Sequence, residues 1–176
     1  YLYISKSRKG LKMAQNYNNF YDRNRKSFSP QGNKPRSMLP HETQPLRVPS
    51  NYVDIAEQTM RTYFEKQEEC HGRKITTTKL RNLLSLVSEV YNVENLRTER
   101  QLLPESVTKL NLMRMRAAYE CGRDATTKYF VWPAKIMEYL KWFSTAQPDS
   151  RAGLIDFYHY MEALVAFHRY LGGSEN

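Results

Sequence analysis

The sequence has few cysteines and no long apolar run. Its 176 residues include 2 Cys, and Cys70 and Cys121 stand far apart without a CxxC pair. This argues against a disulfide framework and against a zinc site, so we expect no metal and no other cofactor. No segment reaches the length of a membrane span, and no apolar segment follows a basic start as an export signal requires. We therefore expect a cytoplasmic protein without a membrane anchor.

The sequence also lacks the motifs of enzyme active sites. It has no Gly-rich phosphate loop, no paired-carboxylate constellation and no catalytic triad signature. His168 falls within an apolar helical stripe, which is typical of a histidine packed in the core. His159 has no Asp, Ser or Cys at a spacing that would indicate a catalytic site. Arg36 and His41 have a ribonuclease-like spacing, but they lie in a proline-rich segment that offers no rigid scaffold to hold their side chains in a catalytic geometry. We therefore expect a protein that is not an enzyme.

Positive charge is abundant but unevenly placed. The formal net charge is +9 at pH 7. Residues 1–50 hold ten Lys and Arg against Asp22 and Glu42, whereas residues 51–176 hold seventeen against sixteen acidic residues. The total makes an anionic partner the first to consider. In residues 51–176, any basic surface must come from the arrangement of charges rather than from their sum.

Residues 1–50 show no sustained helical or strand period, and they are rich in Asn, Ser, Pro and basic residues. Such a composition cannot bury enough apolar surface to offset the entropy of ordering, so we predict a disordered basic tail. The stretch NYNNFYDRNRKSF (16–28) could stack on bases, or it could simply be part of a solubilising tail. Because MAQNYNNF from Met13 resembles a natural start, we expect residues 1–12 to be an extension.

From Ser50 onward, apolar residues recur at helical spacing and no strand period competes. The pattern predicts an all-α domain, a five-helix bundle, over residues 51–173. Pro133 falls inside the fourth helix, where proline costs about 3 kcal/mol, so we expect a kink or a helix that restarts there. The expected helices span residues 52–69, 76–92, 104–122, 126–145 and 154–171.

Basic side chains recur at every seventh position on two of these helices. In the third, Lys109, Arg116 and Arg123 fall within about 40° of one another and form a stripe about 21 Å long. In the fourth, Lys128 and Lys135 repeat the spacing. A solvated helix face explains any one of these residues. Their recurrence on several helices of a nearly neutral domain favours a binding surface.

The polar side of the second helix adds to this surface. Arg81 shares its strip with Ser85 and Ser88, whose small hydroxyl groups would let a phosphate approach closely. Lys74 and Lys79 flank the start of the helix, where free backbone amide groups suit an anion. We therefore predict that this side of the helix faces phosphates.

The third helix is apolar on two opposite sides, and the fifth carries small and aromatic residues opposite its core stripe. A helix that is apolar on two sides either lies at the centre of its bundle or uses its second apolar side to contact another protein. We take Met115 and Tyr170 as candidate contacts between subunits. The equally weighted alternative is that the third helix is central in the bundle and that the outer side of the fifth helix is an ordinary surface. The pattern consists of Leu112, Met115 and Tyr119 opposite Leu110, Ala117 and Cys121, and of Ala163, Ala166 and Tyr170.

Three segments occur in one order and spacing: KITTTKLRNLLSLVSEVYN (74–92), MRAAYECGRD (115–124) and YMEALVAFHRYLGG (160–173). Together they resemble the small, all-helical subunit of type III-A CRISPR RNA-guided effector complexes, the Csm small subunit. The likeness covers residues 51–173. The tail has no counterpart in the family, and the step from Trp132 to Pro133 departs from its smoother helix.

The resemblance implies a non-catalytic five-helix bundle whose copies stack in a filament along the guide RNA and its paired target RNA. Its other partners would be the backbone and large subunits of the complex, and its role would be antiviral defence. The residues that match the family's basic positions are Lys79, Arg81, Arg116 and Arg123. The stripe pattern alone adds Lys74, Lys109, Lys128 and Lys135 as candidate RNA-binding residues.

Two other classes of protein stay open. A stand-alone helical nucleic-acid-binding regulator would read bases with the second helix, where Asn82 is the one good candidate. A helical ribonuclease would need His159 or His168 as its catalytic group. The sequence does not determine the copy number in a complex, the RNA strand that each basic residue contacts, whether the tail binds RNA, or whether residues 1–12 are native.

Overall fold

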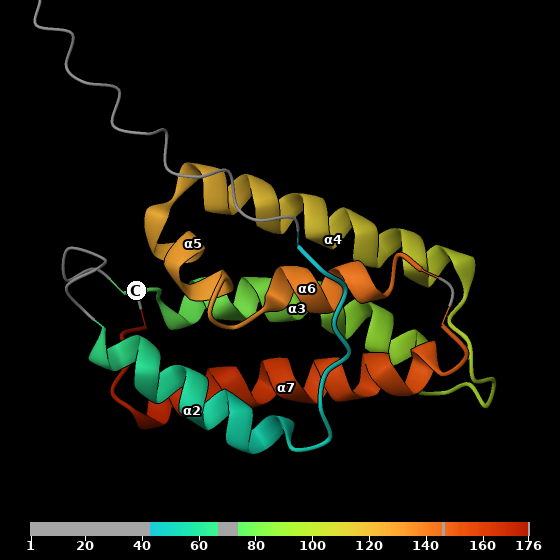
Figure 1. The fold of residues 1–176 in the computed structure, drawn as a ribbon, viewed down its shortest axis with the longest axis horizontal. Helices are drawn as coiled ribbons and strands as arrows, with labels where there is room; N and C mark the ends of the chain where they lie inside the picture. The colour runs from blue at the N-terminus through green and yellow to red at the C-terminus, as the bar shows by residue number, and fades with distance from the viewer. Residues whose placement is uncertain (1–42, 67–73, 146, 176) are drawn as a thin grey trace, which may run out of the picture. The chain divides into compact units, whose positions relative to one another are not determined.

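The computed structural model describes residues 43–66, 74–145 and 147–175, all within one packing unit, residues 42–176. Over these ranges the chain forms six α-helices and no strand (Figure 1), which confirms the predicted all-α class. The helices are α2 (Tyr52–Glu65), α3 (Thr77–Glu94), α4 (Pro104–Arg123), α5 (Ala125–Val131), α6 (Ile136–Trp142) and α7 (Ser150–Tyr170).

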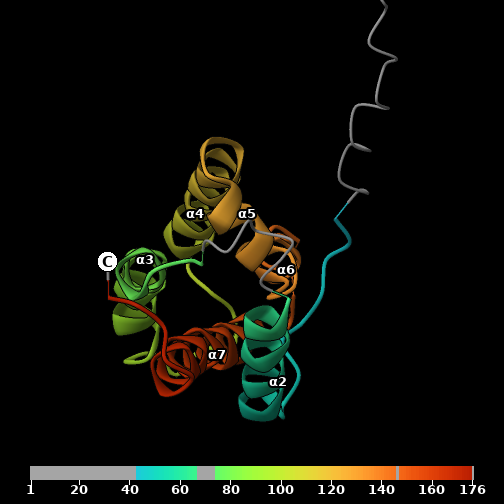
Figure 2. The ribbon, with the colours of Figure 1, turned by 90° about the vertical axis from the view of Figure 1, so that its left-hand side faces the viewer.

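The six helices surround one core. α7 packs against α2 and α3, and α4 packs against α3, α5 and α6. Seen end-on, the helices are arranged around a common centre (Figure 2). Large side chains from several helices are fully buried there, and the hydrophobic effect of this burial holds the bundle together. They include Met60, Leu80, Leu110, Phe130, Tyr139, Phe157 and Tyr160.

The helices α7 and α2 bury their apolar residues to different extents. On α7, Leu154 and Leu164 are fully buried, and so is His168. On α2, Met60 is buried but Val53 is 49 % exposed. Apolar residues at helical spacing indicate which side of a helix is buried, but they do not determine how far along the helix the burial extends.

The predicted fourth helix is divided in two, so the bundle has six described helices instead of five. α5 ends at Val131, and α6 begins at Ile136, beyond the proline. Between them, Lys135 adopts the left-handed conformation, with φ of 52°. The hydroxyl of Tyr160 on α7 donates a hydrogen bond to the Ala134 carbonyl, 2.9 Å away, and so anchors the turn in the core.

Residues 43–50 belong by sequence to the predicted tail, yet they pack on the helices. The Leu46 N–H donates to the Glu138 carbonyl of α6 at 3.2 Å, and Arg47 pairs with Asp156 of α7 at 3.6 Å. Val48 is buried, at 4 % exposure. The rest of the predicted tail, with the proposed extension 1–12, lies outside the described residues, as do Cys70, Arg36 and His41.

Candidate nucleic-acid interface

A surface groove with a volume of about 670 Å³ lies between α3 and α4, next to the start of α5. Its apolar lining includes one of the two apolar sides that the sequence indicated on α4, Leu112, Met115 and Tyr119, and these residues are 49–67 % exposed. The second apolar side of α4 therefore faces solvent, and α4 is not a central helix. The groove is lined by Lys79, Asn82, Leu83, Leu86, Leu112, Met115, Arg116, Tyr119, Glu120, Arg123 and Thr127.

Three of the eight predicted RNA-binding residues meet in this groove, namely Lys79, Arg116 and Arg123. The predicted basic stripe on α4 is present, because Arg116, Arg123 and Lys109 are all exposed on one continuous helix. Arg123 pairs with Glu120, one turn earlier, at 2.9 Å. Arg116 and Lys109 form no ion pair with any residue that the structure describes. These two are the side chains on the stripe whose charge is not already offset by a neighbour.

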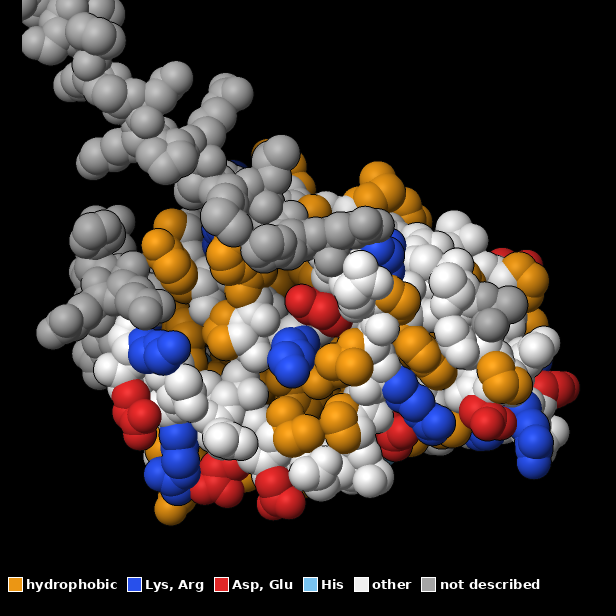
Figure 3. Space-filling model, viewed as in Figure 1, with side chains coloured by type: hydrophobic (Ala, Val, Ile, Leu, Met, Phe, Trp, Pro, Cys, Tyr) orange, Lys and Arg blue, Asp and Glu red, His pale blue; other side chains and the backbone are white. Residues whose placement is uncertain are grey.

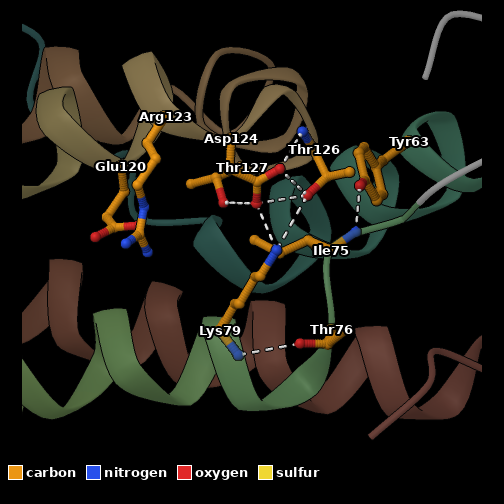
Figure 4. A network of polar contacts seen from close by, with 9 residues as sticks. All are labelled: Tyr63, Ile75, Thr76, Lys79, Glu120, Arg123, Asp124, Thr126 and Thr127. Carbon is orange, nitrogen blue, oxygen red and sulfur yellow. Dashed lines mark hydrogen bonds and ion pairs between the residues drawn. The ribbon is translucent and has the colours of Figure 1, made fainter. Parts of the chain in front are cut away.

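Lys79 is committed to a contact within the fold. Its Nζ lies 2.5 Å from Oδ2 of Asp124, the residue that caps the start of α5 (Figure 4). Asp124 also accepts hydrogen bonds from the Thr126 N–H at 3.0 Å and from the Thr127 hydroxyl at 2.9 Å. Burial acts to raise the pKa of Asp124, but hydrogen bonds from Lys79, Thr126 and Thr127 outweigh it and hold the pKa well below its usual range. Lys79 thus ties α3 to α5.

The start of α3 has no free anion site of the kind predicted. The Thr77 N–H donates to the Ser174 carbonyl at 2.9 Å, and the Thr78 N–H donates to the Glu175 carbonyl at 3.2 Å. The next amide, of Lys79, donates to the Thr76 side chain at 3.3 Å, so Thr76 caps the start of the helix. The amide groups that sequence reasoning left open are therefore bonded within the chain.

The polar residues of the strip around Arg81 already have partners within the chain. Ser85 and Ser88 donate their hydroxyl hydrogens to the carbonyls of Asn82 and Leu84 on their own helix, at 2.9 and 3.0 Å. Arg81 pairs with Glu175 at 2.6 Å. Sequence reasoning missed this carboxylate because its partner lies 94 positions away in the chain.

The remaining predicted cations lie apart from the groove. The Lys74 ammonium is 4.2 Å from the centre of the Phe64 ring, and the Lys128 ammonium is 4.7 Å from that of Trp132. Lys135 is exposed in the turn between α5 and α6, so Lys128 and Lys135 do not share a helix face as predicted. On the face in Figure 3, basic side chains stand singly among acidic and apolar ones.

The two described histidines have different surroundings. His168 is fully buried, with Nε2 2.9 Å from the Ile75 carbonyl and Nδ1 3.1 Å from the Thr77 hydroxyl, and burial lowers its pKa. His159 lies 3.0 Å from Glu162, one turn along α7. Within the described ranges, no group of three or more His, Cys, Asp or Glu could hold a metal ion. No described helix is long and apolar enough to cross a membrane.

The fold and the surface define a small all-α domain whose exposed features are a mixed basic and apolar groove and a basic stripe. This chain belongs to the Csm2 type III-A family, whose model matches residues 51–174. The match confirms the resemblance drawn from the three sequence segments, and it covers almost the same residues.

Relatives of known name agree with the family. The chain is 33 % identical over 125 residues to the CRISPR system Cms protein Csm2 of Streptococcus thermophilus, covering 71 % of this chain and 94 % of that protein. It is 39 % identical over 102 residues to the protein of the same name from Mycobacterium tuberculosis H37Rv, covering 57 % and 78 %. The corresponding protein of Enterococcus italicus is 27 % identical over 105 residues, covering 60 % and 74 %.

Proposed function

We propose that this chain is the non-catalytic small subunit of a type III-A CRISPR effector complex and that it binds the duplex of guide RNA and target RNA. Family membership and the CRISPR names of its relatives support its place in such a complex. Its partners there are the backbone and large subunits and further copies of itself, stacked in a filament. The complex serves antiviral defence in the cytoplasm.

The observation that carries RNA binding is the basic stripe on α4. Lys109, Arg116 and Arg123 are exposed on one continuous helix, and the first two are without an ion-pair partner among the described residues. The pairing of guide and target carries the sequence information, so the protein need only contact phosphates and riboses of an A-form duplex. Binding of this kind tolerates any sequence and weakens as salt rises.

We rank the eight candidate residues by the contacts that each already makes within the chain. Lys109 and Arg116 are available at once, and Lys135 is exposed in its turn. Lys74 and Lys128 each lie over an aromatic ring. The other candidates must first exchange a carboxylate of the same chain for a phosphate. These are Lys79, Arg81 and Arg123.

The test replaces Arg116 with alanine in the assembled complex and measures target-RNA affinity over a salt series. We expect weaker binding of every target sequence, with a salt slope smaller by about 0.7–0.9, because one phosphate contact is lost. Arg100→Ala is the control, since it removes an 86 % exposed arginine, whose ion pair with Asp149 is long at 4.0 Å, from the loop between α3 and α4. Equal affinities of the two variants at every salt concentration would show that Arg116 is not an RNA contact.

We also propose that the exposed apolar side of α4 and the end of α7 join successive copies. Met115 is 66 % exposed and Tyr170 is 76 % exposed. Large apolar side chains that face solvent lose this exposure when another subunit covers them. Met115 lies in the groove beside Leu112 and Tyr119, which are themselves about half exposed or more.

Two outcomes would favour other classes of protein. A sequence preference in a duplex-DNA selection would favour a stand-alone regulator, for which Asn82 in the groove is the base-reading candidate. Loss of an RNA cleavage activity on His159→Ala, with the fold intact, would favour a ribonuclease. His168 is a poorer candidate for that role, because it is fully buried and both of its ring nitrogens have partners.

A further inference from the structure

The residues that follow α7 turn back toward the start of α3 (Figures 1 and 2). Gly172 has φ of 84°, a conformation that other residues rarely adopt, and it reverses the chain. The N–H of Gly173 donates to the His168 carbonyl at 2.8 Å. A side chain on Gly173 would overlap the buried ring of His168, so only glycine fits at this position. The turn is therefore set by the fold and brings residues 174 and 175 to α3.

The backbone of residues 174 and 175 is fixed against the first turn of α3. Each carbonyl accepts two hydrogen bonds, one from a backbone N–H and one from a threonine hydroxyl. Thr77 donates to Ser174 from both groups at 2.9 Å. Thr78 donates to Glu175 from its N–H at 3.2 Å and from its hydroxyl at 2.7 Å. The side chain of Glu175 can therefore move without loss of these contacts.

The Glu175 carboxylate bridges two arginines from different helices. One oxygen, Oε1, lies 2.6 Å from Nη1 of Arg81 on α3, and the other, Oε2, lies 3.0 Å from Nη1 of Arg169 on α7. All three side chains are about half exposed. Guanidinium groups bind carboxylates and phosphates through the same charged hydrogen bonds. The two arginines thus already hold an anion, and that anion belongs to the chain.

We propose that Arg81 and Arg169 form a phosphate-binding site that Glu175 occupies in the free protein. A phosphate of the RNA backbone displaces the Glu175 side chain and bridges the same two arginines. The source of the phosphate rests on the proposed RNA binding, but Arg169 and the competing Glu175 are new to it. Displacement is easy, because exposed ion pairs contribute little stability and are screened by salt, while a nucleic acid also releases its bound counterions.

The test is Glu175→Gln, which removes the competing charge and keeps the size of the side chain. We expect this variant, in the assembled complex at low salt, to bind target RNA about two- to five-fold more tightly, the scale of exposed ion pairs. Arg169→Ala should weaken binding and, combined with Glu175→Gln, should abolish the gain. Glu57→Gln is the matched control, because it frees Arg61 from an equally exposed ion pair on α2.

The outcomes separate this site from the wider function. If wild-type complex binds target RNA but Glu175→Gln and Arg169→Ala bind it with unchanged affinity, the site is wrong and the proposed function stands. If Glu57→Gln gives the same gain as Glu175→Gln, the effect is one of net charge and the site is also wrong. If RNA affinity does not depend on this subunit at all, both proposals fail. Circular dichroism of each variant shows whether the fold is intact.

Discussion

At the scale of single residues, the partners of the basic side chains decide which charges are available. Lys79 and Arg81 are close in sequence, yet Asp124 holds one and Glu175 holds the other. Those carboxylates lie 45 and 94 positions away, so helical periodicity could predict that the basic residues are exposed but not that they are paired. The same periodicity predicted that Arg116 is exposed, and Arg116 forms no ion pair with a described carboxylate.

The contact between Lys79 and Asp124 should depend on pH. We expect Asp124→Asn to lower the free energy of unfolding at pH 7 by about 1 kcal/mol, because the amide still caps α5 but no longer carries a charge for Lys79. The folded state lowers the pKa of Asp124, so its contribution is complete above the unfolded pKa, about 3.9, and is lost as the pH falls through the lower folded value.

Urea unfolding at pH 7 and at pH 3 measures this contribution. The difference between wild type and Asp124→Asn should shrink at the lower pH. Glu89→Gln serves as the control, since Glu89 is exposed on α3 and has no ion pair with a described residue. A difference between wild type and Asp124→Asn that is the same at both pH values would contradict the assigned ion pair.

At the scale of the helix, the break between α5 and α6 shows what the sequence can and cannot predict. The cost of Pro133 predicted an interruption, and the interruption is there. Its form depends on tertiary contacts, because the Tyr160 hydroxyl holds the Ala134 carbonyl in the turn. The helix then restarts at Ile136 with Lys135 in a left-handed conformation. No local pattern encodes that hydrogen bond, so the face of the restarted helix could not be predicted.

The left-handed conformation of Lys135 makes a testable difference between glycine and alanine. We expect Lys135→Gly to be more stable to unfolding than Lys135→Ala by about 0.5–1 kcal/mol, because glycine avoids the clash of Cβ while losing more backbone entropy. Both variants remove the same charge, so they also share any effect on RNA. Thermal unfolding of the two proteins measures the difference. Equal midpoints would show that Lys135 is not strained.

At the scale of the whole molecule, the all-α class followed from the helical periodicity, whereas the packing of residues 43–50 on the helices did not. The positions of the exposed basic and apolar residues could be predicted only in part. The stripe on α4 was visible because all of its residues lie on one helix. The groove was not, because Leu83 and Leu86 of α3 and Leu112 of α4 come together only through packing. The pairing of residues 174 and 175 with α3 likewise has no signal in a local pattern.

The number of copies in the assembled complex tests whether the exposed apolar side of α4 and the end of α7 contact another subunit. We expect Met115→Glu and Tyr170→Glu each to lower the number of copies per complex, because a buried charge at the contact is costly. Native mass spectrometry counts the copies. Val53→Glu on α2 is the control, since Val53 is also an exposed apolar residue, at 49 %. An unchanged copy number in both variants would rule out these contacts.

The hydrogen bonds between the start of α3 and residues 174 and 175 also affect the order in which the domain folds during synthesis. Thr77 and Thr78 must wait for partners that are synthesised 97 positions later. At about 5–20 residues per second, a ribosome needs about 5–20 s to reach them. During that interval the first amide groups of α3 can bond only to water or to transient partners. The closing of this end of the domain therefore follows the synthesis of α7.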